Sequence, residues 1–409
     1  AAAPTKLADA GDLVRWGLPL AKGVTNLGTA VAIGSLAFAA FALSAKTPQL
    51  GKAMNLAAFG AGIWTIFGAI SFLFTYLSVT GSAFSTSDVF GQGLWLFATD
   101  IELGRYLAMN LIVGALLTMF ALAFQNLTAA LLLAAFGLVG LVPIALTGHA
   151  AGAANHAMAV NSIGLHLVAV CIWVGGLVAL VVVRDSDPER QTNLVKRYST
   201  LALISFLIVA ISGIAVAIIS LGKIENLFTP YGWLVMLKVG ALLLLGAIGG
   251  HYRFRLINKM ATLPAKAKEF WLIVVGELLV MGAAVGLGTA LSRTAPPADP
   301  LENFVPTPAS ILTGEQLPSE LLPSTWFTAW KIDLLWLVIS LGAIAIYLIG
   351  VWRLHRRGDK WPVIRTLSWL GGWLFLIYIT CGTPNVYEQY LFSVHMISHM
   401  MLTMGVPLL

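Results

Sequence analysis

The stretch "NSIGLHLVAVCIWVGGLVALVVV" (161–183) contains no Asp, Glu, Lys or Arg and is long enough to cross a lipid bilayer as one helix. Runs of the same kind recur along the whole chain. Eleven of them predict membrane spans, namely 27–45, 56–80, 104–124, 129–148, 161–183, 199–221, 232–250, 271–291, 332–352, 367–382 and 391–409. The predicted fold class is therefore all-α, a polytopic transmembrane helical bundle of about eleven spans.

The composition of the chain also indicates a membrane protein. Of its 409 residues, 58% are hydrophobic and only 10% are charged, whereas about a quarter of the residues in soluble domains carry a charge. The net charge of +6 comes from basic residues in the loops that flank the spans, so it does not indicate nucleic-acid binding. Cys171 and Cys381 are the two cysteines, which excludes a disulfide framework and a cysteine-rich zinc site.

The distribution of Lys and Arg predicts which way the chain crosses the membrane. When alternate loops are assigned to one side, sixteen basic residues fall on that side and seven on the other. Since Lys and Arg favour cytoplasmic loops, the N-terminus is predicted to be extracytoplasmic. The protein is expected to be a multi-pass membrane protein.

A proline-rich stretch divides the chain into two parts. Residues 296–323 hold seven of the seventeen prolines and no Lys or Arg, and this density of proline argues against a helix. We therefore expect an eight-span domain at 1–293 and an extracytoplasmic proline-rich linker at 294–330. A second membrane domain is expected at 331–409.

Histidines gather at one predicted membrane level. Cys381 ends a predicted span at this outer level, whereas His251 and His355 stand among arginines at the predicted cytoplasmic face and are expected to be interfacial. Polar side chains inside a bilayer are costly and usually functional, so the outer histidines become candidate metal ligands together with Cys381. These histidines are His149, His156, His166, His395 and His399.

The chemistry of the last run favours copper. In "HMISHMMLTM" (395–404) two histidines four residues apart lie one above the other on a helix, beside a stripe of Met396, Met400 and Met404. Imidazoles bind copper or zinc, and thioethers select cuprous copper. The run lacks the glutamate of the zinc-protease motif, so zinc-dependent hydrolysis is not expected. A copper-binding protein that is not an enzyme is expected. Methionines that merely fill an irregular core are the alternative.

Helical geometry also predicts how this last run faces its surroundings. At about 100° per residue, the histidine pair and the methionine stripe together span half of the helix circumference, and Met401 falls on the other side. We expect the ligand face to look into the helix bundle. Met401 is expected to face lipid or to pack against a neighbouring part of the protein.

The histidines of the first domain give a weaker geometric signal. His149 and His156 are seven residues apart, about 10 Å along a helix, which is too far to share one ion unless the backbone between them is not helical. Gly148 and Gly152 make such a break possible. A pair of His149 and His166 across the loop is the simpler geometry.

Two charged side chains lie within predicted spans. Lys238 and Glu277 suggest a proton path, but the predicted topology places them at different depths. Lys238 can extend its ammonium toward the outer surface, and Glu277 lies near the inner end of its span.

Two families resemble parts of this chain. Residues 90–300 resemble the copper-resistance D (CopD) family of membrane proteins, through "TGHA" (147–150), "GLHLVAVCIWVGGLVAL" (164–180), "YGWLVMLKVGALLLLGAIGGHYR" (231–253) and "GELLVMGAAVGLGTALSRTAPP" (276–297). After the proline-rich stretch, "SVHMISHMMLTMGVPLL" (393–409) is similar to the start of the CtaG family of cytochrome c oxidase assembly factors. Fusions of these two domains are typical of actinobacteria. A CtaG domain is expected to continue for several spans beyond Leu409, so the second domain is expected to be incomplete.

The resemblance implies copper handling by a multi-pass protein at the bacterial plasma (inner) membrane. It implies copper uptake or retention by the first domain, with His149 and His166 as matching histidines, and copper delivery toward oxidase assembly by the second, with His395 and His399. The expected cargo is cuprous copper. The expected partners are the lipid bilayer and either cytochrome c oxidase subunits or a periplasmic copper chaperone. The alternatives are a haem-binding electron-transfer protein and a passive accessory subunit of a respiratory complex.

Overall fold

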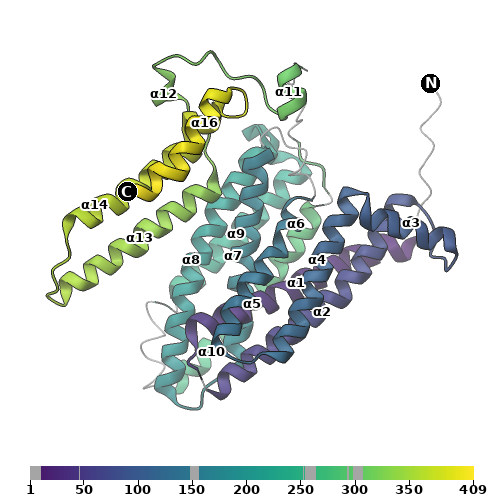
Figure 1. The fold of residues 1–409 in the computed structure, drawn as a ribbon. Coiled ribbons are helices and arrows are strands. Elements are labelled where there is room, and N and C mark those ends of the chain that lie inside the picture. The colour runs from purple at the N-terminus through teal and green to yellow at the C-terminus, as the bar shows by residue number, and fades with distance from the viewer. Residues whose placement is uncertain are drawn as a thin grey trace, which may run out of the picture. The chain divides into compact units, whose positions relative to one another are not determined.

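A computed structural model describes residues 11–45, 47–147, 156–251, 253, 264–292, 294–297 and 307–409. This described part is helical and contains no strand (Figure 1). The chain divides into two compact units. Unit 1 comprises Ala1–Ala151 and Ile163–Ala298, and unit 2 comprises Gly152–Ser162 and Asp299–Leu409.

Unit 1 contains most of the long helices, and prolines start several of them. Pro48, Pro188 and Pro230 each stand at the first position of a helix, where the missing N–H would have no partner in any case. The helices are α1 (Asp12–Ala42), α2 (Pro48–Thr80), α3 (Asp88–Thr99), α4 (Glu102–Ala123), α5 (Leu127–Val139), α6 (Leu141–Ala145), α7 (His156–Val182), α8 (Pro188–Leu221), the 3-10 helix η2 (Ile224–Phe228), α9 (Pro230–His251) and α10 (Pro264–Leu291).

Unit 2 is built around a helical hairpin. Asp333 begins α13 by accepting hydrogen bonds from the N–H groups of Leu335 and Trp336, which are otherwise unpaired in a first helical turn. The elements are α11 (Pro308–Thr313), α12 (Thr325–Thr328), α13 (Leu334–Arg356), α14 (Val363–Cys381), α15 (Thr383–Tyr387), α16 (Phe392–Met400), the π-helix η5 (Met401–Gly405) and α17 (Val406–Leu408).

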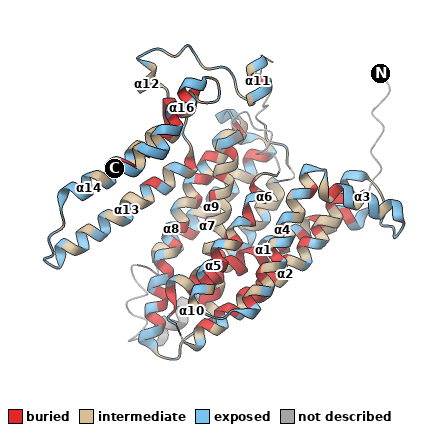
Figure 2. Cartoon of the chain, in the orientation of Figure 1, coloured by how far each residue is buried: buried red, intermediate tan, exposed pale blue. Residues whose placement is uncertain are grey.

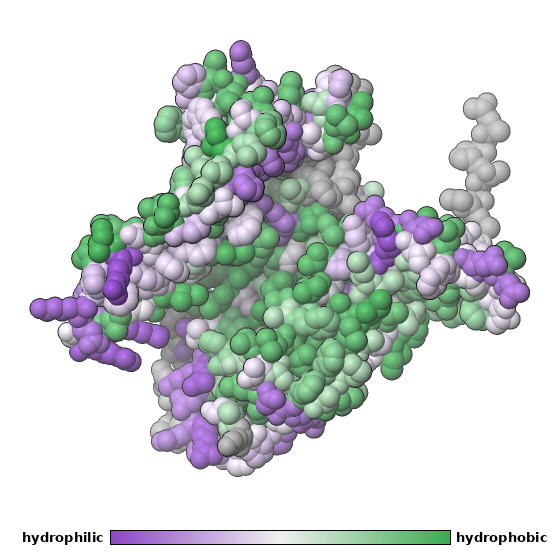
Figure 3. Space-filling model, in the orientation of Figure 1, coloured by the Kyte–Doolittle hydropathy of each residue, from purple (hydrophilic) through white to green (hydrophobic). Residues whose placement is uncertain are grey.

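Ten of the eleven predicted spans are confirmed as helices long and apolar enough to cross a membrane. The run 391–409 is not among them. There α16 is short and continues through the π-helix η5 into the single turn of α17. Figure 3 shows a large hydrophobic area on the surface of unit 1. The exposed apolar residues of this unit include Ile66, Ile112, Met119 and Leu131. Such a surface fits a lipid solvent.

Small residues let the helices of unit 1 approach closely. A Cβ on Gly34 of α1 would collide with the carbonyl oxygen of Cys171 on α7, and a Cβ on Gly175 would collide with that of Ala30. Close backbone approach through small residues is how membrane helices gain packing contacts without a hydrophobic driving force. The crossing of α1 and α7 therefore depends on these two glycines. The core around it is the buried region coloured red in Figure 2.

A polar contact fixes the break between α5 and α6. Trp64 is fully buried, and its Nε1–H donates to Asn110 Oδ1 at 2.9 Å. The Nδ2 group of Asn110 in turn donates to the carbonyl oxygen of Gly140 at 2.7 Å. Gly140 is the residue between α5 and α6. A carbonyl at a helix break within a bilayer needs a partner from the protein, and Asn110 supplies it.

The prediction that the proline-rich stretch 296–323 contains no helix is wrong at α11. At α11, Thr307 and Ser310 form a reciprocal capping box, Pro308 stands in the first turn, and Gly314 ends the helix in the left-handed conformation with φ 75°. A proline in the first turn costs no hydrogen bond, so proline density alone does not exclude short helices. Residues 298–306 of the predicted linker lie outside the described residues.

Candidate functional site

His166 of α7 is half-buried and contacts α8. Its Nδ1 lies 3.1 Å from the hydroxyl oxygen of Ser212. That hydroxyl also lies 2.6 Å from the carbonyl oxygen of Ile208, one helical turn earlier. A serine has a single hydroxyl hydrogen, and the shorter contact to a pure acceptor uses it. Ser212 therefore accepts a hydrogen bond from the Nδ1–H of His166.

The tautomer of His166 follows from this assignment. With the proton on Nδ1, the lone pair of the neutral imidazole is on Nε2. Metal-binding histidines are usually held in the same way, with the second ring N–H donated to a neighbouring acceptor that orients the ring. Ser212 is fully buried, so water does not compete for this bond. His166 is thus suited to offer Nε2 to a soft or borderline metal ion.

Lys238 and Glu277 occupy different levels of unit 1. The ammonium of Lys238 on α9 lies 3.7 Å from the position that a Cβ on Gly288 of α10 would occupy. Glu277 is buried on α10, eleven residues before Gly288 and thus about 16 Å away along the helix. This spacing agrees with the predicted difference in depth.

The residues after His166 are packing residues. Trp173 makes an edge contact with Phe206, with the ring centroids 5.7 Å apart, and its carbonyl oxygen accepts the hydroxyl of Tyr198 at 3.2 Å. Gly175 faces α1, as described above, and Gly176 lies against the ring of Tyr198. In the stretch that carries the resemblance to CopD proteins, Trp-Val-Gly-Gly therefore supplies the fit between helices, and His166 remains the candidate metal ligand.

Other predicted ligands of the first domain fall outside what the structure describes. His149 lies among residues 148–155, which are not described, and the side chain of His156 is not described either. The pairing of His149 with His166 therefore stays a prediction. The helix α7 begins at His156 instead of the predicted 161, so His166 lies about three turns from its start.

The histidines and methionines of α16 face outward within unit 2. Val394 and Ser398 take the inward side of α16, with 1% and 2% of their surface exposed. His395, Met396, His399 and Met400 are all exposed, whereas Met401 is partly buried. The prediction that the ligand face looks into the bundle is therefore wrong for the described residues. The rule that polar side chains turn inward in a membrane is here overridden by the packing of Val394 and Ser398.

The π-helix changes the position of Met404. Between Met401 and Gly405 the backbone hydrogen bonds span five residues, which inserts an extra residue into the turn. A calculation at 100° per residue therefore fails beyond Met400, and Met404 does not continue the stripe of Met396 and Met400. Met404 is exposed nonetheless. Single π-turns within α-helices are frequent at functional sites.

Cys381 has a structural contact. It is the last residue of α14, it is buried, and its thiol donates to the carbonyl oxygen of Asp333 at 3.6 Å. The thiol is thus directed at the start of α13. More generally, within the described parts of the chain no three His, Cys, Asp or Glu side chains converge as a metal site. The thioethers beside His395 and His399 are a different donor type, and this mixed set fits cuprous copper.

Family models match three segments of the chain. Residues 10–160 match the N-terminal domain model of copper resistance protein D-like proteins, and residues 192–291 match the copper resistance protein D model. Residues 345–409 match the cytochrome c oxidase caa3 assembly factor model (Caa3_CtaG). No solved structure gives a significant match.

Curated relatives match the chain over part of their length. The copper transport protein CutJ of Bacillus subtilis is 29% identical over 198 residues, which cover 46% of this chain and 35% of CutJ. The uncharacterized protein ML1998 of Mycobacterium leprae is 36% identical over 104 residues, and the protein Mb0105 of Mycobacterium bovis is 34% identical over 103. These two matches cover 24% of this chain and 15% of each relative. Along the chain, two segments thus match copper resistance protein D models and a third matches the Caa3_CtaG model, in a polytopic membrane protein.

Proposed function

We propose that this protein binds cuprous copper as cargo at the plasma membrane and passes it toward cytochrome c oxidase assembly, without catalysing a reaction. The observation that carries the proposal is the exposed face of α16. Two imidazoles and two thioethers stand there in successive turns, at His395, Met396, His399 and Met400. This donor set favours cuprous copper over zinc, and its exposure allows exchange with a partner.

The two units have different parts in this proposal. His166, held by Ser212, retains copper inside the helices of unit 1, and the face of α16 exchanges it. CutJ is a copper transport protein by name, and the Caa3_CtaG model describes an oxidase assembly factor. We propose by extension that the receiving partner is an oxidase subunit, or that a periplasmic copper chaperone exchanges copper with α16.

Metal analysis of the purified protein tests the proposal. We expect bound copper after purification under reducing conditions and much less of it in a variant lacking His395 and His399. A protein free of copper but with a Soret absorption band would establish the haem alternative. A protein that contains neither metal, and does not bind cuprous copper on titration, would leave the role of a passive subunit.

The orientation in the membrane is part of the same proposal, because we propose that the partners that exchange copper with α16 act outside the cytoplasm. Glu320, in the predicted extracytoplasmic linker, is polar and exposed, so it is a suitable position for labelling. We expect a cysteine at position 320 to react with an impermeant reagent in intact cells, and a cysteine at position 190 to react only in lysed cells. The native Cys171 and Cys381 are buried and give little background. Labelling of position 190 in intact cells would reverse the orientation.

A further inference from the structure

Residues 307–330, which precede α13 in unit 2, expose apolar side chains where a water-exposed loop would expose polar ones. The exposed fractions are 85% for Leu312 and 80% for Phe327. Large apolar patches on a surface mark binding sites for a protein, a ligand or a membrane. The exposed large apolar residues of the segment are Ile311, Leu312, Leu317, Leu322, Phe327 and Trp330.

Polar groups of the same segment are turned toward the rest of unit 2. Glu315 pairs with Lys331 at 2.6 Å, and both side chains are about one-fifth exposed. The hydroxyl of Tyr390 lies 3.3 Å from that of Thr313 and donates to the carbonyl oxygen of Gln316 at 3.1 Å. Part of the hydrogen-bonding capacity of the segment is therefore used within unit 2, while its large apolar side chains are exposed beside Gln316, Ser319, Glu320, Ser324 and Thr328.

The segment is held in this arrangement by α14 and α15. The Tyr378 hydroxyl donates to the carbonyl oxygen of Trp326 at 2.8 Å. The Thr383 hydroxyl, which is fully buried, donates to the carbonyl oxygen of Thr325 at 2.7 Å. Both contacts fix the backbone of α12, which is drawn in pale blue and tan in Figure 2. Because these hydrogen bonds hold the backbone in place, the apolar side chains that point outward belong to a fixed surface.

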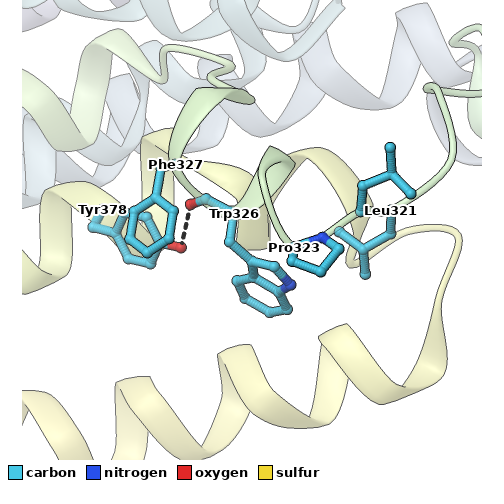
Figure 4. Close-up of a pocket in the computed structure, with 6 residues that line it drawn as sticks. Leu321, Pro323, Trp326, Phe327 and Tyr378 are labelled. Carbon is cyan, nitrogen blue, oxygen red and sulfur yellow. Dashed lines mark hydrogen bonds between the residues drawn. The ribbon is translucent and has the colours of Figure 1, made fainter.

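A pocket opens on this surface. It has a volume of about 460 Å³ and is lined by Leu321, Leu322, Pro323, Trp326, Phe327 and Tyr378. Figure 4 shows the rings of Trp326, Phe327 and Tyr378 around it, with the Tyr378 hydroxyl already bound to the Trp326 carbonyl. The lining is mainly hydrocarbon and aromatic. A pocket of this chemistry accommodates an alkyl chain better than a polar solute.

We propose that residues 307–330 form a membrane-interface element that lies on the lipid surface, with a phospholipid acyl chain in the pocket lined by Trp326, Phe327 and Tyr378. Its apolar surface continues along the chain into α13, a candidate span whose Trp336 and Ile339 are exposed in unit 2. Trp and Tyr are enriched where spans meet the polar headgroups. Continuity with a lipid-facing helix favours lipid over a soluble partner protein.

Charge indicates which force drives this contact. The segment 307–330 contains no Lys or Arg, and of its two acidic residues Glu315 is paired with Lys331. Attraction to anionic headgroups requires clustered basic residues, so burial of apolar surface is the source of affinity. Binding is therefore expected to be independent of salt and of the content of anionic lipid.

Fluorescent labels at single cysteines test the proposal in the full chain. We would attach an environment-sensitive dye at Leu312→Cys or Phe327→Cys and reconstitute the protein into phosphatidylcholine vesicles that contain nitroxide-labelled lipid. The matched control is Glu320→Cys, a polar exposed position in the same segment. An interfacial element lies about 5–10 Å into the headgroup boundary, so we expect about a twofold or greater loss of fluorescence at 312 and 327. The control label should instead be quenched by aqueous iodide.

The outcomes separate lipid from its competitors. Leu312 is almost fully exposed, so its replacement does not endanger the fold even if Phe327→Cys does. Quenching of the 312 label by iodide, and not by the nitroxide lipid, would overturn the proposal. Protection from both quenchers would place a protein surface there and also overturn it. Adding phosphatidylglycerol or salt should leave the lipid quenching unchanged, and a strong dependence would contradict the apolar mechanism.

Discussion

His166 and the pair His395 and His399 are embedded in contrasting surroundings. His166 lies between helices of unit 1 and has one ring nitrogen assigned to Ser212. The pair on α16 is exposed, with thioethers on both sides and a π-helix immediately after it. An enclosed imidazole with a fixed tautomer suits retention of an ion, whereas an exposed set of soft donors suits its transfer. Because the two regions differ in this way, we expect mutations in them to change copper affinity to different degrees.

The largest effect is expected for the double change His395→Ala and His399→Ala. Loss of a residue that only orients a ligand costs about 10–100-fold in metal affinity, so loss of two ligands should cost about 100-fold or more. Competition with a chromogenic chelator measures the cuprous affinity. The matched control is His355→Ala, an exposed histidine on α13 whose Nδ1 lies 2.9 Å from the Val351 carbonyl oxygen. An equal loss in this control would remove the special role of α16.

A second, smaller effect is expected for Ser212→Ala. Without the hydroxyl, the Nδ1–H of His166 loses its acceptor, and copper affinity at this histidine should fall about 10–100-fold. Nitrogen NMR of labelled histidine should report loss of the Nδ1–H tautomer even in copper-free protein. Ser212→Thr should restore the tautomer, and Ser205→Ala, at another buried serine of α8, should leave it unchanged. An unchanged tautomer in Ser212→Ala would refute the assignment whether or not copper binds.

The double change Met396→Leu and Met400→Leu should have an intermediate effect. Both side chains are about half exposed, and this swap conserves volume, so the free energy of unfolding should change by less than about 1.5 kcal/mol. Cuprous affinity should fall about tenfold, with zinc affinity unchanged, because the soft donors are gone. Calorimetry and metal competition measure the two quantities. If the affinity for cuprous copper is unchanged, the methionines are surface residues that do not bind copper, and the histidines account for the binding.

The smallest effect is an increase, expected for Lys238→Met. Lys238 lies on α9 in the same unit as His166, and removing one positive charge from the surroundings of a bound cation is worth roughly 1 kcal/mol, or about fivefold in affinity. Copper titration of a variant that already lacks His395 and His399 isolates this site. Lys196→Met, at an exposed lysine of α8, is the control. A decrease in affinity would show that Lys238 orders the helices around His166.

The spans were predictable because lipid imposes a length and a composition that a sequence displays directly. The run around His166 is one example: its apolar residues predict a helix whatever its neighbours are. The role of Ser212 as the hydrogen-bond partner of His166 could not be predicted from the sequence, because the two residues lie on different helices. In the sequence, the Ser-Gly pair at 212–213 marks only a small, polar position in an apolar run. The outward face of α16 was mispredicted because the orientation of this helix is set by the tertiary packing of Val394 and Ser398, which the sequence of the run does not show. The π-helix after Met400 has no periodic signature at all.

The crossing of α1 and α7 at Gly34 and Gly175 has a consequence for synthesis. The two glycines are 141 residues apart in the chain (175 minus 34). At about 5–20 residues per second, α7 leaves the ribosome about 7–28 s after α1. During that delay the small-residue surface of α1 is open to any other helix in the membrane. We therefore expect a substitution at Gly34 first to slow the packing of α7 against α1. Newly made chains would then be degraded by proteases before the two helices have packed.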